Sequence, residues 1–114
     1  MKQKGTVVVM YDAPAETDEW MHGPHYDEVK GTPGVTAIRR YEVIQGPDGS
    51  RKYIALIESD DIDATVAWRS SPEGARSQAE ANSHGVANRY GMVCRRIYSS
   101  VPGETTPATN TELG

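Results

Sequence analysis

The chain has 114 residues, 37% of them hydrophobic and 25% charged, and its formal net charge is −4. This length predicts a single domain, which we expect over residues 1–100, and the composition is typical of a soluble globular protein. The negative charge and the lack of a basic stripe argue against binding of nucleic acid, because an acidic surface repels phosphate. No apolar stretch approaches the length of a membrane span.

The cysteine content indicates a reducing compartment. A single cysteine, Cys94, cannot build a disulfide framework. The opening MKQKGTVVVM has too short an apolar run for a secretory segment, so we expect a cytoplasmic protein. The chain has no phenylalanine, and its large apolar anchors are two tryptophans and six tyrosines, each with a polar atom that needs a partner when buried.

In chain order, the first half predicts a strand, a helix and a second strand. Residues 5–12, GTVVVMYD, have valine on both faces, which is typical of a strand covered on two sides. A helix capped near Thr17 should follow. Gly23-Pro24 predicts a kink or a restart within it, because proline lacks the backbone donor and clashes with the preceding turn. Residues 35–44 then favour a strand.

The second half predicts a hairpin partner, two helical pieces and a last strand. Residues 52–59, KYIALIES, return from the tight turn GPDGS to pair with the strand before it. Residues 59–68 open with Ser and Asp residues that suit a helix N-terminus. Residues 71–82 form a second helical piece, with Ser71 as cap and proline at its first position. Residues 89–100 are the last strand.

This order of elements predicts an α+β fold, a ferredoxin-like βαββαβ arrangement with a four-stranded antiparallel sheet and helices on one face. The other face is also apolar, since Val8 and Met10 point opposite to Val7 and Val9. A sheet that is apolar on both faces needs a second cover, and we expect a homodimer that pairs through the open face. Residues 101–114 are polar and rich in Thr and Pro, so we expect a flexible tail or a dimer arm.

Several residues resemble the dimeric α+β barrel superfamily, in particular its EthD-like branch and uncharacterised relatives. The matching features are Trp20, His25 five residues later, Pro33-Gly34, and Arg40-Tyr41 within the second strand. The hairpin return KYIALIES and the segment DDIDATVAWRSSPEGAR are also similar to that branch. The resemblance spans roughly residues 5–100. It implies a dimeric α+β barrel, and it leaves the reaction open because the superfamily hosts many chemistries.

Two departures from the EthD-like pattern bear on the histidine. The family position after the tryptophan is usually Tyr and is Met21 here, and the residue before the histidine is usually acidic and is Pro24 here. An acidic neighbour can orient or charge an imidazole. Its loss weakens the expectation that His25 acts as a strong base.

His25 is the first candidate catalytic residue. If Pro24 starts a new helical turn with Gly23 as its N-cap, the positive end of the helix dipole keeps the imidazole neutral, as a general base requires. The resemblance places the matching histidine at the mouth of a cleft between the first helix and the sheet. The alternative is a surface histidine at a helix kink.

Tyr11 and Arg40 complete the candidate catalytic set. The Tyr11 hydroxyl ends the first strand and can donate to a substrate oxygen, and an arginine that faces the helices can hold a carboxylate or enolate oxygen. Strand alternation puts Arg40 and Tyr41 on opposite faces of the sheet, and the sequence does not decide which of the two faces the helices. The competing role for Arg40 is an ion pair in the dimer interface.

The remaining candidates would line the pocket or serve the core. As substrate-binding residues we expect Trp20, Tyr41, Tyr53, Trp68 and His84. His84 also suits a helix C-terminus followed by a glycine cap. We expect no metal site, because His22 and His25 lie on either side of Gly23-Pro24 and match no metal-ligand spacing. No nucleotide, flavin or haem motif is present, so we expect no cofactor, although some relatives in the superfamily bind haem.

The combined pattern supports a cofactor-independent enzyme that uses a histidine general acid/base on a small cyclic or aromatic carbonyl metabolite. The reaction would be of the isomerase, cyclase, decarboxylase or lyase type, on an aromatic or lactone-like ligand. One alternative is a non-catalytic EthD-like accessory or ligand-binding protein of a degradation or biosynthesis pathway. Another is a cofactor-free monooxygenase of the antibiotic-biosynthesis type, and a third is a purely structural dimer.

Overall fold

A computed structural model describes residues 2–104 and confirms the predicted order of elements. The strands are β1 (Gly5–Asp12), β2 (Val35–Glu42), β3 (Tyr53–Ser59) and β4 (Ala87–Arg95). The helical elements are η1 (Ala15–Thr17), α1 (Asp18–Trp20), η2 (Met21–His25), α2 (Tyr26–Lys30), α3 (Ile62–Arg69) and α4 (Pro72–Ser83). Among the described residues, no helix has the length and apolarity needed to cross a bilayer.

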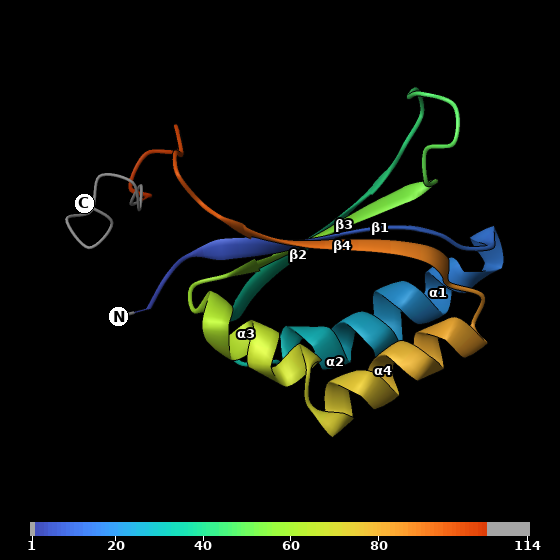
Figure 1. Cartoon of the computed structure of the whole chain (residues 1–114), viewed down its shortest axis with the longest axis horizontal. Helices are drawn as coiled ribbons and strands as arrows, with labels where there is room; N and C mark the ends of the chain where they lie inside the picture. Colours follow the sequence, from blue (N-terminus) through green and yellow to red (C-terminus); the bar gives the residue numbers. More distant parts are fainter. Residues whose placement is uncertain (1, 105–114) are drawn as a thin grey trace.

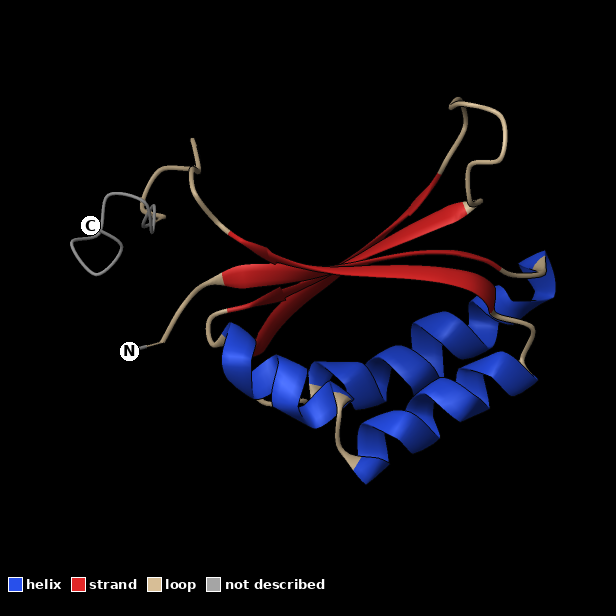
Figure 2. Ribbon diagram, in the orientation of Figure 1, coloured by secondary structure: helices blue, strands red, loops and turns tan. Residues whose placement is uncertain are grey.

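The four strands form one antiparallel sheet in the order β2-β3-β1-β4. Val9 of β1 pairs with Ala55 of β3 on one side and with Gly91 of β4 on the other. All helices of residues 2–104 lie on one side of the sheet, and within that range the other side carries none (Figures 1 and 2). The α+β, ferredoxin-like prediction is therefore correct.

The first helical segment differs from the prediction at Gly23-Pro24. The chain stays helical from η1 to α2 without a restart, and η2 is a wider π-helical turn in which the Tyr26 N–H donates to the Met21 carbonyl five residues earlier. A π turn accommodates a proline, because the missing N–H and the ring no longer have to fit the tighter α spacing. Gly23 is therefore not an N-cap, and His25 does not begin a new helix.

The end of each helix shows which of the predicted caps form. Thr17 makes no cap, and its hydroxyl instead donates to the His84 carbonyl at the end of α4 at 2.7 Å. Asp61 caps α3 by accepting from Ala64, and Ser71 caps α4 with Pro72 at the first position, as predicted. These caps fix where α3 and α4 meet and so shape one wall of the cavity described below.

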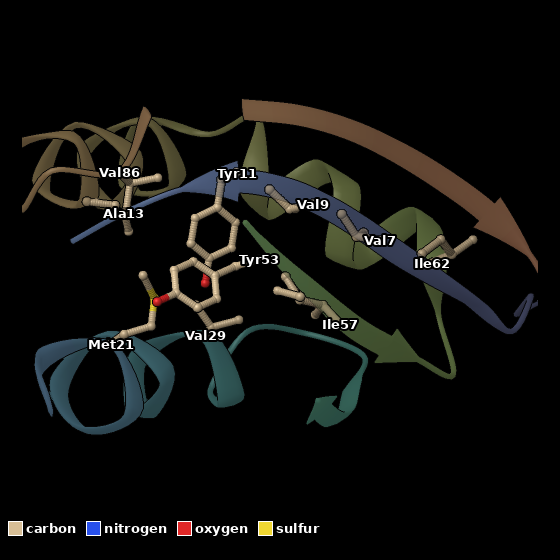
Figure 3. Packing of buried hydrophobic residues seen from close by; sticks show 12 residues of the cluster. Val7, Val9, Tyr11, Ala13, Met21, Val29, Tyr53, Ile57, Ile62 and Val86 are labelled. Atoms are coloured by element: carbon tan, nitrogen blue, oxygen red, sulfur yellow. The ribbon is translucent and has the colours of Figure 1, made fainter. Parts of the chain in front are cut away.

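The core lies between the sheet and the helices. Alternate strand residues point into it, as the period of two requires. They are Val7, Val9 and Tyr11 from β1 and Tyr53, Ala55 and Ile57 from β3, all buried. The helices contribute Met21, Val29, Ile62 and Ala81. Figure 3 shows the Tyr11 and Tyr53 rings beside each other and close to Met21, and their centroids are 5.7 Å apart. Burying each large side chain contributes roughly 1.5–3 kcal/mol.

The opposite face of the sheet is apolar, as predicted, and no helix in the described part of the chain covers it. Val8 pairs with Leu56 and with Met92, so the three side chains form a row across three strands. On the two edge strands of this face, Tyr41 of β2 and Tyr90 of β4 are 50% and 52% exposed. We call this surface the open face.

The C-terminal part leaves the sheet earlier than predicted. The last strand ends at Arg95 rather than at residue 100, and Ile97 and Tyr98 are exposed. The predicted tail or arm, residues 101–114, lies outside the described residues from position 105 onward.

Candidate functional site

A cavity of about 60 Å³ lies between the sheet and the helices. Its floor is the apolar centre of the sheet, with Val9, Ala55 and Ile57, and Met21 and Trp68 form part of its walls. By the measure in which one water needs about 10–15 Å³, this volume holds roughly four to six water molecules, about the space of one small ring. Its polar lining includes Tyr11, His25, Tyr26, Arg69, Gln78 and Arg89.

His25 lies in the π-helical turn η2, and its partly buried ring lines the cavity. The ring stacks on Trp20 with centroids 4.8 Å apart. Burial lowers the pKa of His25 below 6.5, and the opposing effect of the Glu28 carboxylate does not cancel it. No hydrogen bond to this ring occurs within residues 2–104. The imidazole is thus neutral near pH 7 and has a free nitrogen lone pair, although burial and not a helix N-terminus is the cause.

Two tyrosine hydroxyls lie beside the histidine in the cavity wall. The Tyr11 hydroxyl accepts a hydrogen bond from Arg40 Nε at 2.6 Å, so its own proton is left for another acceptor. The Tyr26 hydroxyl is buried and has no hydrogen-bond partner within the described part of the chain. Burial and the nearby Tyr11 raise the pKa of Tyr26 far above its usual value. Tyr26 therefore remains a protonated phenol that can donate.

Arg40 faces the helices, so its side chain is only 8% exposed and does not belong to the open face. Its Nη1 contacts Asp18 at 2.8 Å and the His22 Nε2 at 3.0 Å, and its guanidinium lies 4.1 Å from the Tyr53 ring centroid. The proposed ion pair at a dimer interface is therefore wrong in location, since the partner is Asp18 of the same chain.

Arg40 and Asp18 stabilise each other's charged forms. Burial would lower the pKa of Arg40, but the hydrogen bonds to Asp18 and Tyr11 outweigh it and the pKa is raised. The hydrogen bond from Arg40 lowers the pKa of the Asp18 carboxyl. Arg40 does not line the cavity and reaches it only through Tyr11.

The five residues predicted to bind substrate lie in different places. Trp68 lines the cavity. Trp20 lies behind His25 and also stacks on the exposed His84, with centroids 3.9 Å apart. Tyr53 is buried beneath Arg40, and Tyr41 lies on the open face, because residues alternate along β2 and Arg40 faces the helices. The structure thus brings His25, Tyr11 and Trp68 to the cavity and leaves Tyr41 on the other side of the sheet.

The two neighbouring histidines do not converge on one site. His22 is exposed and contacts Arg40, whereas His25 lines the cavity. Within residues 2–104, no group of three or more His, Cys, Asp or Glu side chains is arranged to hold a metal ion.

Sequence reasoning missed several polar residues of the cavity, among them Tyr26, Arg69 and Arg89. Arg69 ends α3, directly after Trp68. Arg89 lies near the start of β4, where its Nη2 donates to the Gln78 carbonyl at 3.2 Å and its Nη1 donates to Asn82. Burial lowers the pKa of both arginines, and Arg89 lowers that of Arg69 further. The alternation along the last strand was the signal that could have assigned Arg89 to the helical face.

No protein-family model and no curated protein matches this sequence. Solved structures with the same fold do match. An ethyl tert-butyl ether D (EthD) family protein from Bacillus halodurans is 15% identical, with a TM-score of 0.59 over 79% of this chain and 95% of its own. A dimeric ferredoxin-like protein of unknown function from Thermobifida fusca is 10% identical, with a TM-score of 0.61 over 83% and 92%.

A third similar structure is SnoaB, a cofactor-independent oxygenase from Streptomyces nogalater. It is 15% identical, with a TM-score of 0.60 over 90% of this chain and 99% of its own. At such identities the likeness concerns the backbone arrangement and not the chemistry of the site. The chain therefore has the ferredoxin-like α+β fold that these structures share, as the resemblance implied.

Proposed function

We propose that the protein is a cofactor-independent enzyme in which His25 moves a proton on a small cyclic or aromatic carbonyl compound. The observation that carries the proposal is the state of the His25 ring, which lines a cavity with an apolar floor, is kept neutral by burial and has no hydrogen-bond partner in the described chain. A neutral imidazole with a pKa not far from the working pH is the commonest general base in enzymes.

The second element of the proposed mechanism is a donor for the substrate oxygen. Removal of a proton next to a carbonyl group builds negative charge on that oxygen, and a hydrogen bond to the oxygen lowers the barrier. Tyr11 suits this role, because Arg40 Nε–H donates to its oxygen and leaves the phenolic proton free. Arg40 then acts as a positioning residue. Isomerase, cyclase and lyase reactions can pass through such a proton removal, and a decarboxylase uses the reverse transfer, in which the enolate left by the departing CO2 accepts a proton.

The test is exchange of carbon-bound protons for deuterium. A panel of cyclic ketones and lactones is incubated with the protein in D2O, and loss of the proton beside the carbonyl is followed by ¹H NMR. We expect the His25→Gln variant to slow the exchange by about 100-fold or more, as for loss of a general base. The control is His22→Gln, which removes an exposed histidine three residues away. Unchanged exchange in His25→Gln would exclude His25 from the mechanism.

A second candidate function is cofactor-free oxygenation of an electron-rich phenol. The observation that favours it is the fold that this chain shares with SnoaB, a cofactor-independent oxygenase. Oxygen consumption with phenolic substrates distinguishes the two, since proton transfer alone consumes no oxygen. Ligand binding with neither exchange nor oxygen uptake would instead favour the accessory, ligand-binding alternative.

We also propose that two copies pair through the open face. This face carries apolar side chains on all four strands, and Tyr41, Tyr90 and Met92 remain exposed in the single chain. An apolar sheet face of this kind usually marks an association surface. The similar protein from Thermobifida fusca is dimeric. Sedimentation equilibrium should give twice the chain mass of 12.5 kDa, and a mass of one chain would contradict the pairing.

A further inference from the structure

Two arginines in the cavity wall lack a carboxylate partner. Arg69 and Arg89 both line the cavity, and neither forms an ion pair within residues 2–104. Among the described residues, none that lines the cavity is Asp or Glu, although the full sequence has 16 acidic residues against 12 Lys and Arg. Positive charge is thus concentrated at this cavity of an otherwise acidic protein.

The two carboxylates that raise the pKa of His25 are already paired with another arginine. Glu28 and Glu80 are close enough to act on His25, yet both pair with Arg76 on α4. Neither carboxylate belongs to the cavity lining, and neither forms an ion pair with Arg69 or Arg89. The described residues around the two cavity arginines therefore do not balance their charge.

The two guanidiniums differ in how firmly they are held. Arg89 is fixed by its donations to Gln78 and Asn82, and both of these partners are neutral. The Arg69 guanidinium makes no hydrogen bond in the described chain. Burial penalises both charges, and each repels the other, as the lowered pKa of Arg69 reflects. Both arginines are partly buried, where an uncompensated charge is costly, and an anion between the two groups would relieve both penalties.

We infer that Arg69 and Arg89 form a carboxylate site, and that the natural ligand is a small aromatic or cyclic carboxylate. Guanidinium groups bind carboxylates through paired, charge-assisted hydrogen bonds. The ring of the ligand packs on the apolar floor at Val9 and Ile57 and against Trp68. This inference rests on the proposed function, in which the ring of the substrate reacts beside His25. It adds a carboxylate group on the substrate that anchors this ring through Arg69 and Arg89.

The test compares benzoate with benzamide, its neutral isostere, at fixed ionic strength. Binding to the full-length protein is measured by ¹H–¹⁵N NMR titration, with assigned shifts that report on the cavity. We expect benzoate to bind at least about tenfold more tightly than benzamide, because only the anion gains charge-assisted bonds. Equal affinities, or no saturable binding of benzoate, would overturn the inference. This comparison needs no variant and so does not depend on how the variants fold.

Variants then assign the anion preference to the two arginines. Arg69→Gln and Arg89→Gln should each weaken benzoate binding by about tenfold or more and leave benzamide within about twofold, whereas the Lys variants should retain part of the preference. The matched control is Arg95→Gln, which removes the same charge six residues further along β4, where the side chain is exposed. Full benzoate preference in both Gln variants would contradict the assignment.

The His25→Gln variant separates this inference from the proposed function. If proton exchange survives in His25→Gln but benzoate selectivity still requires the arginines, the general base is wrong and the carboxylate site stands. If exchange needs His25 but benzoate and benzamide bind alike, the proposed function stands and the carboxylate site is wrong.

Discussion

At the scale of single residues, the candidate site depends on how a few buried groups share their hydrogen bonds. Arg40 uses Nε on Tyr11 and Nη1 on Asp18 and His22. Its Nη2 is buried with no partner in the described chain. This arrangement holds the Tyr11 hydroxyl as an acceptor for Arg40, so its proton and the His25 lone pair are both available to a ligand.

Arg40 should also contribute to stability. Replacing Arg40 with Met removes the bond to Asp18, the bond to Tyr11 and the contact with the Tyr53 ring. We expect the free energy of unfolding to fall by about 2 kcal/mol, below the full cost of breaking a buried pair because Asp18 is half-exposed. Urea unfolding measures this, with Arg95→Met as the control. A loss no larger than in the control would contradict the role of Arg40.

The lowered pKa of His25 makes stability depend on pH. Its folded-state pKa lies below the unfolded value of about 6.5, so the unfolded chain binds the proton more readily. Stability from the neutral ring is therefore complete above pH 6.5 and is lost as the pH falls from there toward the folded pKa. We expect the urea midpoint of the wild type to fall more between pH 7.5 and 5.5 than that of His25→Gln. Equal declines of the urea midpoint in the two proteins would show that burial does not lower the pKa of His25.

At the scale of elements, the π-helical turn η2 decides where His25 points. The turn absorbs Pro24 without ending the helix, and the Tyr26 N–H reaches back to the Met21 carbonyl. The segment therefore continues into α2, and His25 and Tyr26 follow each other along the cavity wall. A helix that restarted at Gly23 would have a different helical phase and would direct the imidazole elsewhere.

Two glycines provide a test of this backbone description. An added Cβ at Gly23 meets no atom within 4 Å, so Gly23→Ala should raise the free energy of unfolding by about 0.5–1 kcal/mol through helix propensity. Gly34 has φ +85° and an added Cβ would lie 2.6 Å from Ser59 Oγ, so Gly34→Ala should destabilise the fold. Urea unfolding of both variants checks the pair. Destabilisation by Gly23→Ala would contradict a helical η2.

The elements show what local sequence can and cannot predict. The opposite faces of Val7 and Val8 follow from strand alternation alone, and the Ser71-Pro72 start of α4 follows from capping chemistry, so both were predicted correctly. Gly23-Pro24 also marked a disturbance in the right place. Whether the helix breaks or widens there depends on the packing of Met21 and Val29 in the core, which no local pattern encodes.

At the scale of the whole molecule, the sheet has one face under helices and one apolar open face (Figure 2). If two copies pair through the open face, a charge at its centre should separate them. Met92 lies in the row with Val8 and Leu56, and we expect Met92→Lys to shift the sedimentation mass from two chains to one at low micromolar concentration. The control is Lys30→Met on the helical side. A dimer that persists in Met92→Lys would contradict this interface.

The site was less predictable than the fold because it is assembled from distant segments. His25, Tyr11 and Trp68 were found from residue type and from the resemblance. Arg69 and Arg89 are 20 positions apart, and only the packing of α3 beside α4 and the start of β4 brings both to one cavity. Their lack of carboxylate partners is a property of the folded chain and has no counterpart in the sequence.

The most direct test of the account is an NMR titration of the His25 ring with and without benzoate, with His25→Gln to assign its signal. The account predicts a pKa below 6.5 in the free protein and a rise when benzoate binds, because a nearby negative charge favours the imidazolium. A pKa at or above 6.5 that benzoate does not move would contradict a neutral imidazole in a ligand-binding cavity.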